Sequence, residues 1–204
     1  GMSRPIQVAS AFYRAIGAIL TGAMSRQWAE SLPLQLQGAI QHRSTQGVLL
    51  RLANYMDSLY DKTFPVNDEP VLISFDLKSC FDRMSPDLLL QMLAGWKLLP
   101  QKWATALVAF YDCFTGDGLI TKLDDQTLGL VNLGPRTGGM LQGCALSCIA
   151  CCAQSLWWQR SLESKFGEQL ILVGSYLDDF HVVVSRRHVE DVVGFSKLLL
   201  EPLG

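Results

Sequence analysis

Two adjacent aspartates, Asp178 and Asp179, interrupt a run of mostly apolar residues at 173–184. Apolar stretches on both sides of a short polar step predict a β-hairpin with the pair in its tight turn. Adjacent carboxylates repel each other, and a bound cation would neutralise them. Earlier in the chain, a predicted strand at 71–77 carries Asp76 near its end. Three carboxylates at the ends of apolar strands indicate a site for two magnesium ions and phosphoryl-transfer chemistry.

The composition indicates a large apolar core and an uneven distribution of charge. Of the 204 residues, 49% are hydrophobic, and the mean hydropathy is +0.20. The chain therefore either buries a substantial core or lacks a partner that would cover its surface. Residues 1–56 contain five arginines against one glutamate, whereas the remainder is acidic. A basic arm and an acidic body fit a polyanion held by the arm and metal ions held by the body, although ordinary surface charge explains the counts equally well.

Four of the six cysteines lie in one uncharged stretch at 137–159. Cys148 and Cys151 are spaced as CxxC, but no second ligand pair accompanies them, so we interpret the cysteines as small buried residues in a reducing compartment. The stretch is long enough to span a membrane, but its glycines, serines and glutamines favour a buried helix. No signal peptide opens the chain, and we expect an intracellular protein without membrane contact.

Hydrophobic periodicity and turn residues predict the elements that must position the aspartates. The predicted helices are 9–31, 46–60, from Ser85 to about 95, 102–111, 145–166 and 188–199. The predicted strands are 71–77, a hairpin at 118–133 that turns at Asp124-Asp125, and the hairpin around Asp178-Asp179. We assign no chemistry to Asp124-Asp125, because that pair lies in a polar turn. Helices and strands in this order indicate an α+β fold.

Three segments, in this order, resemble the palm of a reverse transcriptase. They are FDLKSCFD at 75–82, GMLQGCALS at 139–147 and the tyrosine-x-aspartate-aspartate signature YLDD at 176–179. In addition, Arg4-Pro5-Ile6 and the segment 41–45 resemble the fingers of retrotransposon enzymes that lack long terminal repeats. One departure is Cys148, which stands where the family usually has proline.

This resemblance implies a right-hand polymerase architecture. We expect partial fingers at 1–69 and a palm at 70–204, with a hairpin insertion at 118–133. The palm would be an antiparallel sheet packed on helices. We expect the thumb to be absent, and the chain to be poorly active on its own.

The resemblance also implies roles for individual residues. The catalytic and metal-binding groups would be Asp76, the backbone carbonyl of Leu77, Asp178 and Asp179, holding two Mg²⁺ ions with Mn²⁺ as a substitute. The nucleotide-binding residues would be Arg4, Ser79, Cys80, Phe81, Gln142 and Gly143, and Tyr176 would support the primer and the active site.

Phe81 is the residue that we expect to select deoxynucleotides over ribonucleotides. It lies five positions after Asp76, where the family holds a bulky gate against the ribose 2′-hydroxyl. RNA-dependent RNA polymerases usually have an aspartate at that offset, so the aromatic side chain favours deoxynucleotides. Asp82, one position further on, is more typical of a capping or solvent-facing residue than of a metal ligand.

We therefore predict an RNA-directed DNA polymerase core of a retroelement, located inside the cell, in the nucleus or cytoplasm if the retroelement is eukaryotic. Its partners would be an RNA template, a DNA primer, deoxynucleoside triphosphates, and a missing thumb or other domains of the same polyprotein. A group II intron-like polymerase, an RNA-dependent RNA polymerase and a non-catalytic, RNA-binding scaffold remain alternatives. The intact Asp76, Asp178 and Asp179 argue against the scaffold, because a scaffold does not need clustered carboxylates that repel each other.

Overall fold

The fold is the predicted α+β arrangement, seen in a computed structural model. The described residues are 11–38, 40, 42–77, 80–85, 101–103, 105–106, 109–110, 120–125, 129–135, 139–140 and 144–201. The predicted helix from Ser85 to about 95 lies almost entirely outside these residues.

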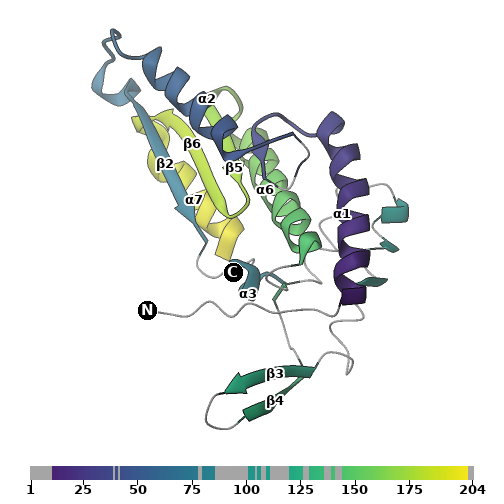
Figure 1. Cartoon of the computed structure of the whole chain (residues 1–204). Helices are drawn as coiled ribbons and strands as arrows, with labels where there is room; N and C mark the ends of the chain where they lie inside the picture. Colours follow the sequence, from purple (N-terminus) through teal and green to yellow (C-terminus); the bar gives the residue numbers. More distant parts are fainter. Residues whose placement is uncertain are drawn as a thin grey trace.

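The main sheet has four strands (Figure 1). In spatial order its strands are β1 (Leu36–Gln37), β5 (Leu170–Tyr176), β6 (Asp179–Ser185) and β2 (Pro70–Asp76). The strands β5 and β6 form the predicted hairpin, and β2 pairs with β6 in the antiparallel sense. The short strand β1 joins β5 in parallel and was not predicted.

One face of the sheet packs against helices α6 (Ala145–Phe166) and α7 (Val189–Leu200). Side chains alternate across a strand, so Phe75 and Phe180 both point to this face. The indole of Trp158 on α6 meets both rings edge-on, with centroid distances of 6.0 Å and 4.9 Å. This aromatic packing fixes the position of α6 along the two strands, next to the strand ends that carry the acidic residues.

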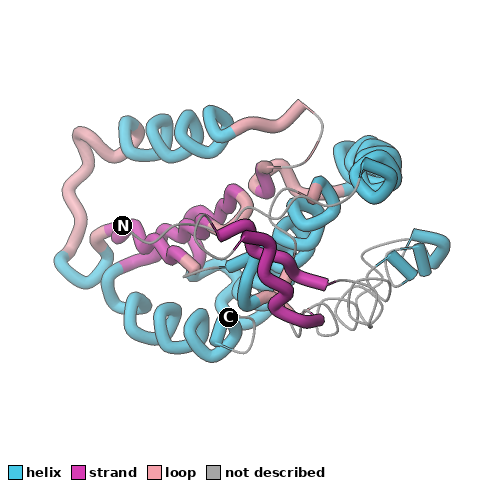
Figure 2. The backbone as a smooth tube through the Cα atoms, turned by 60° about the horizontal axis from the view of Figure 1, so that its bottom comes forward, coloured by secondary structure: helices cyan, strands magenta, loops and turns pink. Residues whose placement is uncertain are grey.

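Helix α2 (Thr45–Asp57) covers part of the opposite face, so that the sheet lies between two helical layers (Figure 2). Its Val48 and Leu52 lie beside Leu172 and Gly174 of β5. The predicted helix at 46–60 is therefore confirmed, although it ends three residues earlier.

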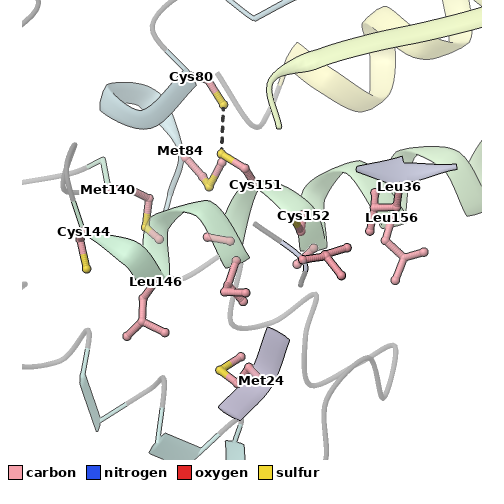
Figure 3. Close-up of a cluster of buried hydrophobic side chains, with 14 of the residues drawn as sticks. Met24, Leu36, Cys80, Met84, Met140, Cys144, Leu146, Cys151, Cys152 and Leu156 are labelled. Carbon is pink, nitrogen blue, oxygen red and sulfur yellow. Dashed lines mark hydrogen bonds between the residues drawn. The ribbon is translucent and has the colours of Figure 1, made fainter. Parts of the chain in front are cut away.

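Helix α6 has the predicted bounds and joins the two parts of the core. Its first half packs with α1 (Ala11–Ser31) and the short helix α3 (Cys80–Arg83), whereas its second half packs on the sheet. Four cysteines are buried as predicted: Cys80, Cys144, Cys151 and Cys152 (Figure 3). Cys148 is only partly buried, and Cys113 lies outside the described residues.

A separate hairpin lies between α3 and α6 in the chain. Strand β3 (Ile120–Asp125) pairs with β4 (Gly129–Pro135) in a two-stranded sheet of its own. The predicted turn at Asp124-Asp125 is wrong, because both aspartates are paired within β3, opposite Leu130 and Gly129. The hydrogen-bonded pairing of β3 with β4 continues through Asp125, beyond the point at which the polar residues predicted the turn.

Nothing in the described helices is both long and apolar enough to cross a membrane. The last predicted helix is confirmed as α7, and the described residues of 101–110 are helical, as the pattern at 102–111 predicts.

A single arginine holds the connection between α1 and β1. The Arg43 guanidinium donates hydrogen bonds to the backbone carbonyls of Ala29, Leu32, Pro33 and Leu36, at 2.5–3.1 Å. The carbonyls at the end of a helix have no partner within the helix, and a cation there is favourable. Arg43 therefore fixes the loop that brings β1 to the edge of the sheet.

We predict that Arg43→Ala lowers the free energy of unfolding by about 2 kcal/mol, because several charge-assisted hydrogen bonds are lost together. Urea unfolding measures this. Arg26→Ala is the matched control, since Arg26 is exposed and bonds only the Gly22 carbonyl of its own helix among the contacts described. The control should change stability by less than about 0.5 kcal/mol. Equal losses from the two variants would mean that the carbonyls around Arg43 do not depend on it.

Candidate active site

The strand register brings the predicted catalytic aspartates to one edge of the sheet. Asp76 at the end of β2 lies directly opposite Asp179 at the start of β6, and Asp179 in turn lies opposite Tyr176 at the end of β5. Directly opposed residues on antiparallel strands have Cα atoms about 4.5–5.5 Å apart. Asp76 and Asp179 are exposed, whereas their neighbours Phe75 and Phe180 pack toward α6. The two carboxylates therefore extend from the same face of the sheet, opposite to the face that packs on α6 and α7.

Asp178 completes this group from the turn between β5 and β6. Leu177 and Asp178 are the two loop residues of the hairpin, and only Leu177 has a positive φ, of 52°. A positive φ at the first of two loop residues is the pattern of a type II′ turn, which matches the twist of the strands. Such a turn normally has glycine at that position, so Leu177 is strained there.

The first and second sequence motifs meet beside these acids. The backbone N–H of Met140 donates a hydrogen bond to the carbonyl of Phe81 in α3. The buried Sγ of Cys80 lies 3.9 Å from Sγ of Cys151 and 3.9 Å from Oε1 of Gln154, both on α6 (Figure 3). The segment after Asp76 is therefore fixed against both the 139–147 segment and helix α6.

A hollow of about 470 Å³ opens next to Asp76. Arg83 from α3 and Lys197 from α7 line it, together with Glu201. Two cationic side chains beside a carboxylate offer a place for an anionic group such as phosphate.

Hard oxygen ligands of this kind suit magnesium. The described residues nevertheless contain no group of three His, Cys, Asp or Glu side chains arranged to hold an ion. The backbone brings the carboxylates together, and binding of a cation would have to draw the side chains in.

Cys148 is a neighbour of this site that the sequence did not single out for chemistry. Burial raises the pKa of its thiol, with smaller contributions from Cys144 and from the negative charge of Asp178. Asp178 therefore lies within electrostatic range of Cys148, which is on the first turns of α6. At this position, where the family usually has proline, the raised pKa keeps the Cys148 thiol neutral.

The remaining predicted residues fall into two groups. Leu77 follows the end of β2 and is half-buried, as is Phe81, which packs against the core beside α6. Asp82 lies in α3. Four predicted nucleotide-binding residues lie outside the described part of the chain: Arg4, Ser79, Gln142 and Gly143.

Comparison with solved structures finds telomerases with a similar fold. Telomerase from Candida albicans, in complex with the TWJ fragment of telomeric RNA, is 18% identical with a TM-score of 0.63, and the match covers 93% of this chain and 32% of that chain. Apo telomerase from Candida tropicalis, truncated from its C-terminal domain, is 18% identical with a TM-score of 0.58, over 94% of this chain and 38% of that one. This chain therefore spans about a third of the length of these telomerases. No curated protein matches it.

The sequence model of the reverse transcriptase (RNA-dependent DNA polymerase) family matches residues 1–200. That match covers nearly the whole chain, and the four-stranded sheet packed on helices is consistent with the fingers–palm fold. On the strength of this match, the chain belongs to the reverse transcriptase family.

Proposed function

We propose that this chain is the fingers–palm core of an RNA-directed DNA polymerase, which adds deoxynucleotides to a DNA primer on an RNA template. The observation that carries the proposal is the register that puts Asp76 directly opposite Asp179, with Asp178 in the adjoining turn. Family membership over residues 1–200 supports the same reaction type.

Asp76, Asp178 and the backbone carbonyl of Leu77 would hold two magnesium ions, and Asp179 would add negative charge to the group. When bound, such ions stabilise the charge that develops on the attacking 3′-oxygen and on the leaving pyrophosphate. The protein contributes by holding the oxygen ligands on the rigid ends of two paired strands. Tyr176 would support the primer end, since it lies in the same cross-strand row as the acids.

Substrate binding would involve the segments on either side of the acids. The backbone N–H groups of Ser79 and Cys80 would bind the triphosphate, with Arg4 reaching it from the fingers. Gln142 and Gly143 would pack against the incoming nucleotide. The bond between the Met140 N–H and the Phe81 carbonyl supports this arrangement, because it joins the two segments involved.

The fingers would comprise 1–69 and the palm 70–204, including the 118–133 hairpin segment. A retroelement without long terminal repeats is the origin we favour, on the basis of Arg4-Pro5-Ile6 and 41–45. The RNA fragment in the Candida albicans telomerase complex supports an RNA partner for this chain as well.

A non-catalytic, RNA-binding scaffold is the second candidate. It is favoured by one observation, which is that no three acidic, histidine or cysteine side chains among the described residues already form a metal-binding group. The polymerase is the better explanation, because a scaffold would not need Asp76 and Asp179 to be directly opposed despite their repulsion.

We predict that Asp178→Asn lowers nucleotide incorporation on a primed RNA template by about 10³-fold or more, because the loss of a metal ligand removes stabilisation of the transition-state charge. Asp124→Asn, on the separate β3–β4 hairpin, is the control and should leave the rate within about twofold. Single-nucleotide extension measures both rates. Similar effects from the two variants would show that the catalytic carboxylates are elsewhere.

We also predict that Phe81→Ala admits ribonucleotides, because truncation removes the ring that would clash with the 2′-hydroxyl. The measurement is the ratio of kcat/KM for a deoxynucleotide to that for its ribonucleotide, which should fall by about 10-fold or more. Phe81 is only half-buried, so its truncation removes less packing than truncation of a fully buried core residue would. A ratio that stays at the wild-type value would place the gate at another residue.

A further inference from the structure

The turn that carries Asp178 is held in a conformation that its own residues do not favour. Leu177 adopts a φ of 52°, in the left-handed region that residues with a Cβ rarely visit. Residues in this region keep their conformation only when the surrounding structure determines it. The support for the turn therefore has to come from elsewhere in the chain.

A buried hydroxyl on α6 supplies one such support. Ser155 is 0% exposed, and its Oγ donates a hydrogen bond to the carbonyl of Leu177 at 2.8 Å. The same Oγ lies 2.9 Å from the carbonyl of Cys151, one turn earlier in the helix. A serine hydroxyl has a single proton, so the two carbonyls compete for it, and this one hydroxyl links the catalytic turn to the helix backbone.

Gly38 packs closely against Leu177 and also supports the turn. Gly38 has a φ of 87°, and a Cβ at this position would lie 2.9 Å from Cγ of Leu177 and 3.2 Å from its backbone nitrogen. The carbonyl of Gly38 accepts a hydrogen bond from the thiol of Cys152 at 3.0 Å, so α6 fixes this glycine too. Leu177 is thus enclosed between the loop after β1 and helix α6.

We propose that Ser155 is a positioning residue of the polymerase site, which together with Gly38 sets the orientation of the turn that carries Asp178 and Asp179. This inference rests on the proposed function for its catalytic consequence. Ser155 touches neither substrate nor the reacting atoms, and it acts through the Leu177 carbonyl. Without its hydroxyl, the turn can relax toward a less strained conformation and move the two carboxylates away from Asp76.

The test compares Ser155→Ala with Ser196→Ala. Ser196 on α7 is also 0% exposed, and its hydroxyl oxygen accepts one buried hydrogen bond from the indole N–H of Trp158 at 3.2 Å. Both variants lose one buried hydroxyl contact, but only the first loses the contact with the turn. The readouts are amide hydrogen exchange at residues 176–179 and the kcat and nucleotide KM of primer extension.

For Ser155→Ala we expect exchange at 176–179 to be about 10-fold faster than in Ser196→Ala, and kcat to fall by about 10- to 100-fold with KM within about twofold. Ser155→Cys keeps a weak donor of similar size and should fall between the wild type and the alanine variant in both readouts. This variant also keeps the test decisive if the alanine variant fails to fold.

Two negative results can be told apart. If the wild type incorporates nucleotides but Ser155→Ala matches Ser196→Ala in both readouts, the positioning role is overturned while the polymerase function stands. If the wild type incorporates no nucleotide even when a downstream thumb segment is added, the proposed function fails, and amide exchange still decides whether Ser155 holds the turn.

Discussion

Burial of helix α6 is the constraint on which the arrangement of the site depends. Residues 149–156 are all buried, and a helix can be buried in this way because it satisfies its own backbone groups. Its polar and sulfur-containing side chains contact three neighbouring segments. Cys151 and Gln154 contact Cys80. The Cys152 thiol donates a hydrogen bond to the Gly38 carbonyl, and the Ser155 hydroxyl donates one to the Leu177 carbonyl. One rigid element thus contacts three segments that are far apart in sequence, and it orients the strand ends that carry the carboxylates.

Much of this arrangement could be predicted from local patterns. The uncharged stretch at 137–159 indicates a buried helix, which the pattern extends over 145–166 as observed, and the apolar runs around Asp178-Asp179 give the hairpin. Pairing β2 with β6 then puts Asp76 opposite Asp179, since both aspartates lie at strand ends. These predictions succeed because hydrophobic periodicity and strand alternation are properties of short segments.

The contacts that hold the site in place could not be predicted in the same way. Strand β1 has only two residues, Leu36 and Gln37, which is too short for any periodicity, and it exists because Arg43 and β5 fix its backbone. The approach of Gly38 to Leu177 joins positions far apart in the chain and leaves no signal in either segment. Cysteine composition correctly indicated burial, but it did not show that Cys148 lies near Asp178.

The central claim is that the two strand ends form one cation site. The most direct measurement is a titration with Mn²⁺ that follows the paramagnetic broadening of the backbone amide signals of Asp76, Leu77, Asp178 and Asp179. The account predicts that all four signals broaden over the same range of Mn²⁺ concentration, and that Asp76→Asn weakens the broadening at 178–179 as well as at 76–77. Unchanged broadening at Asp178 and Asp179 in that variant would contradict a shared site.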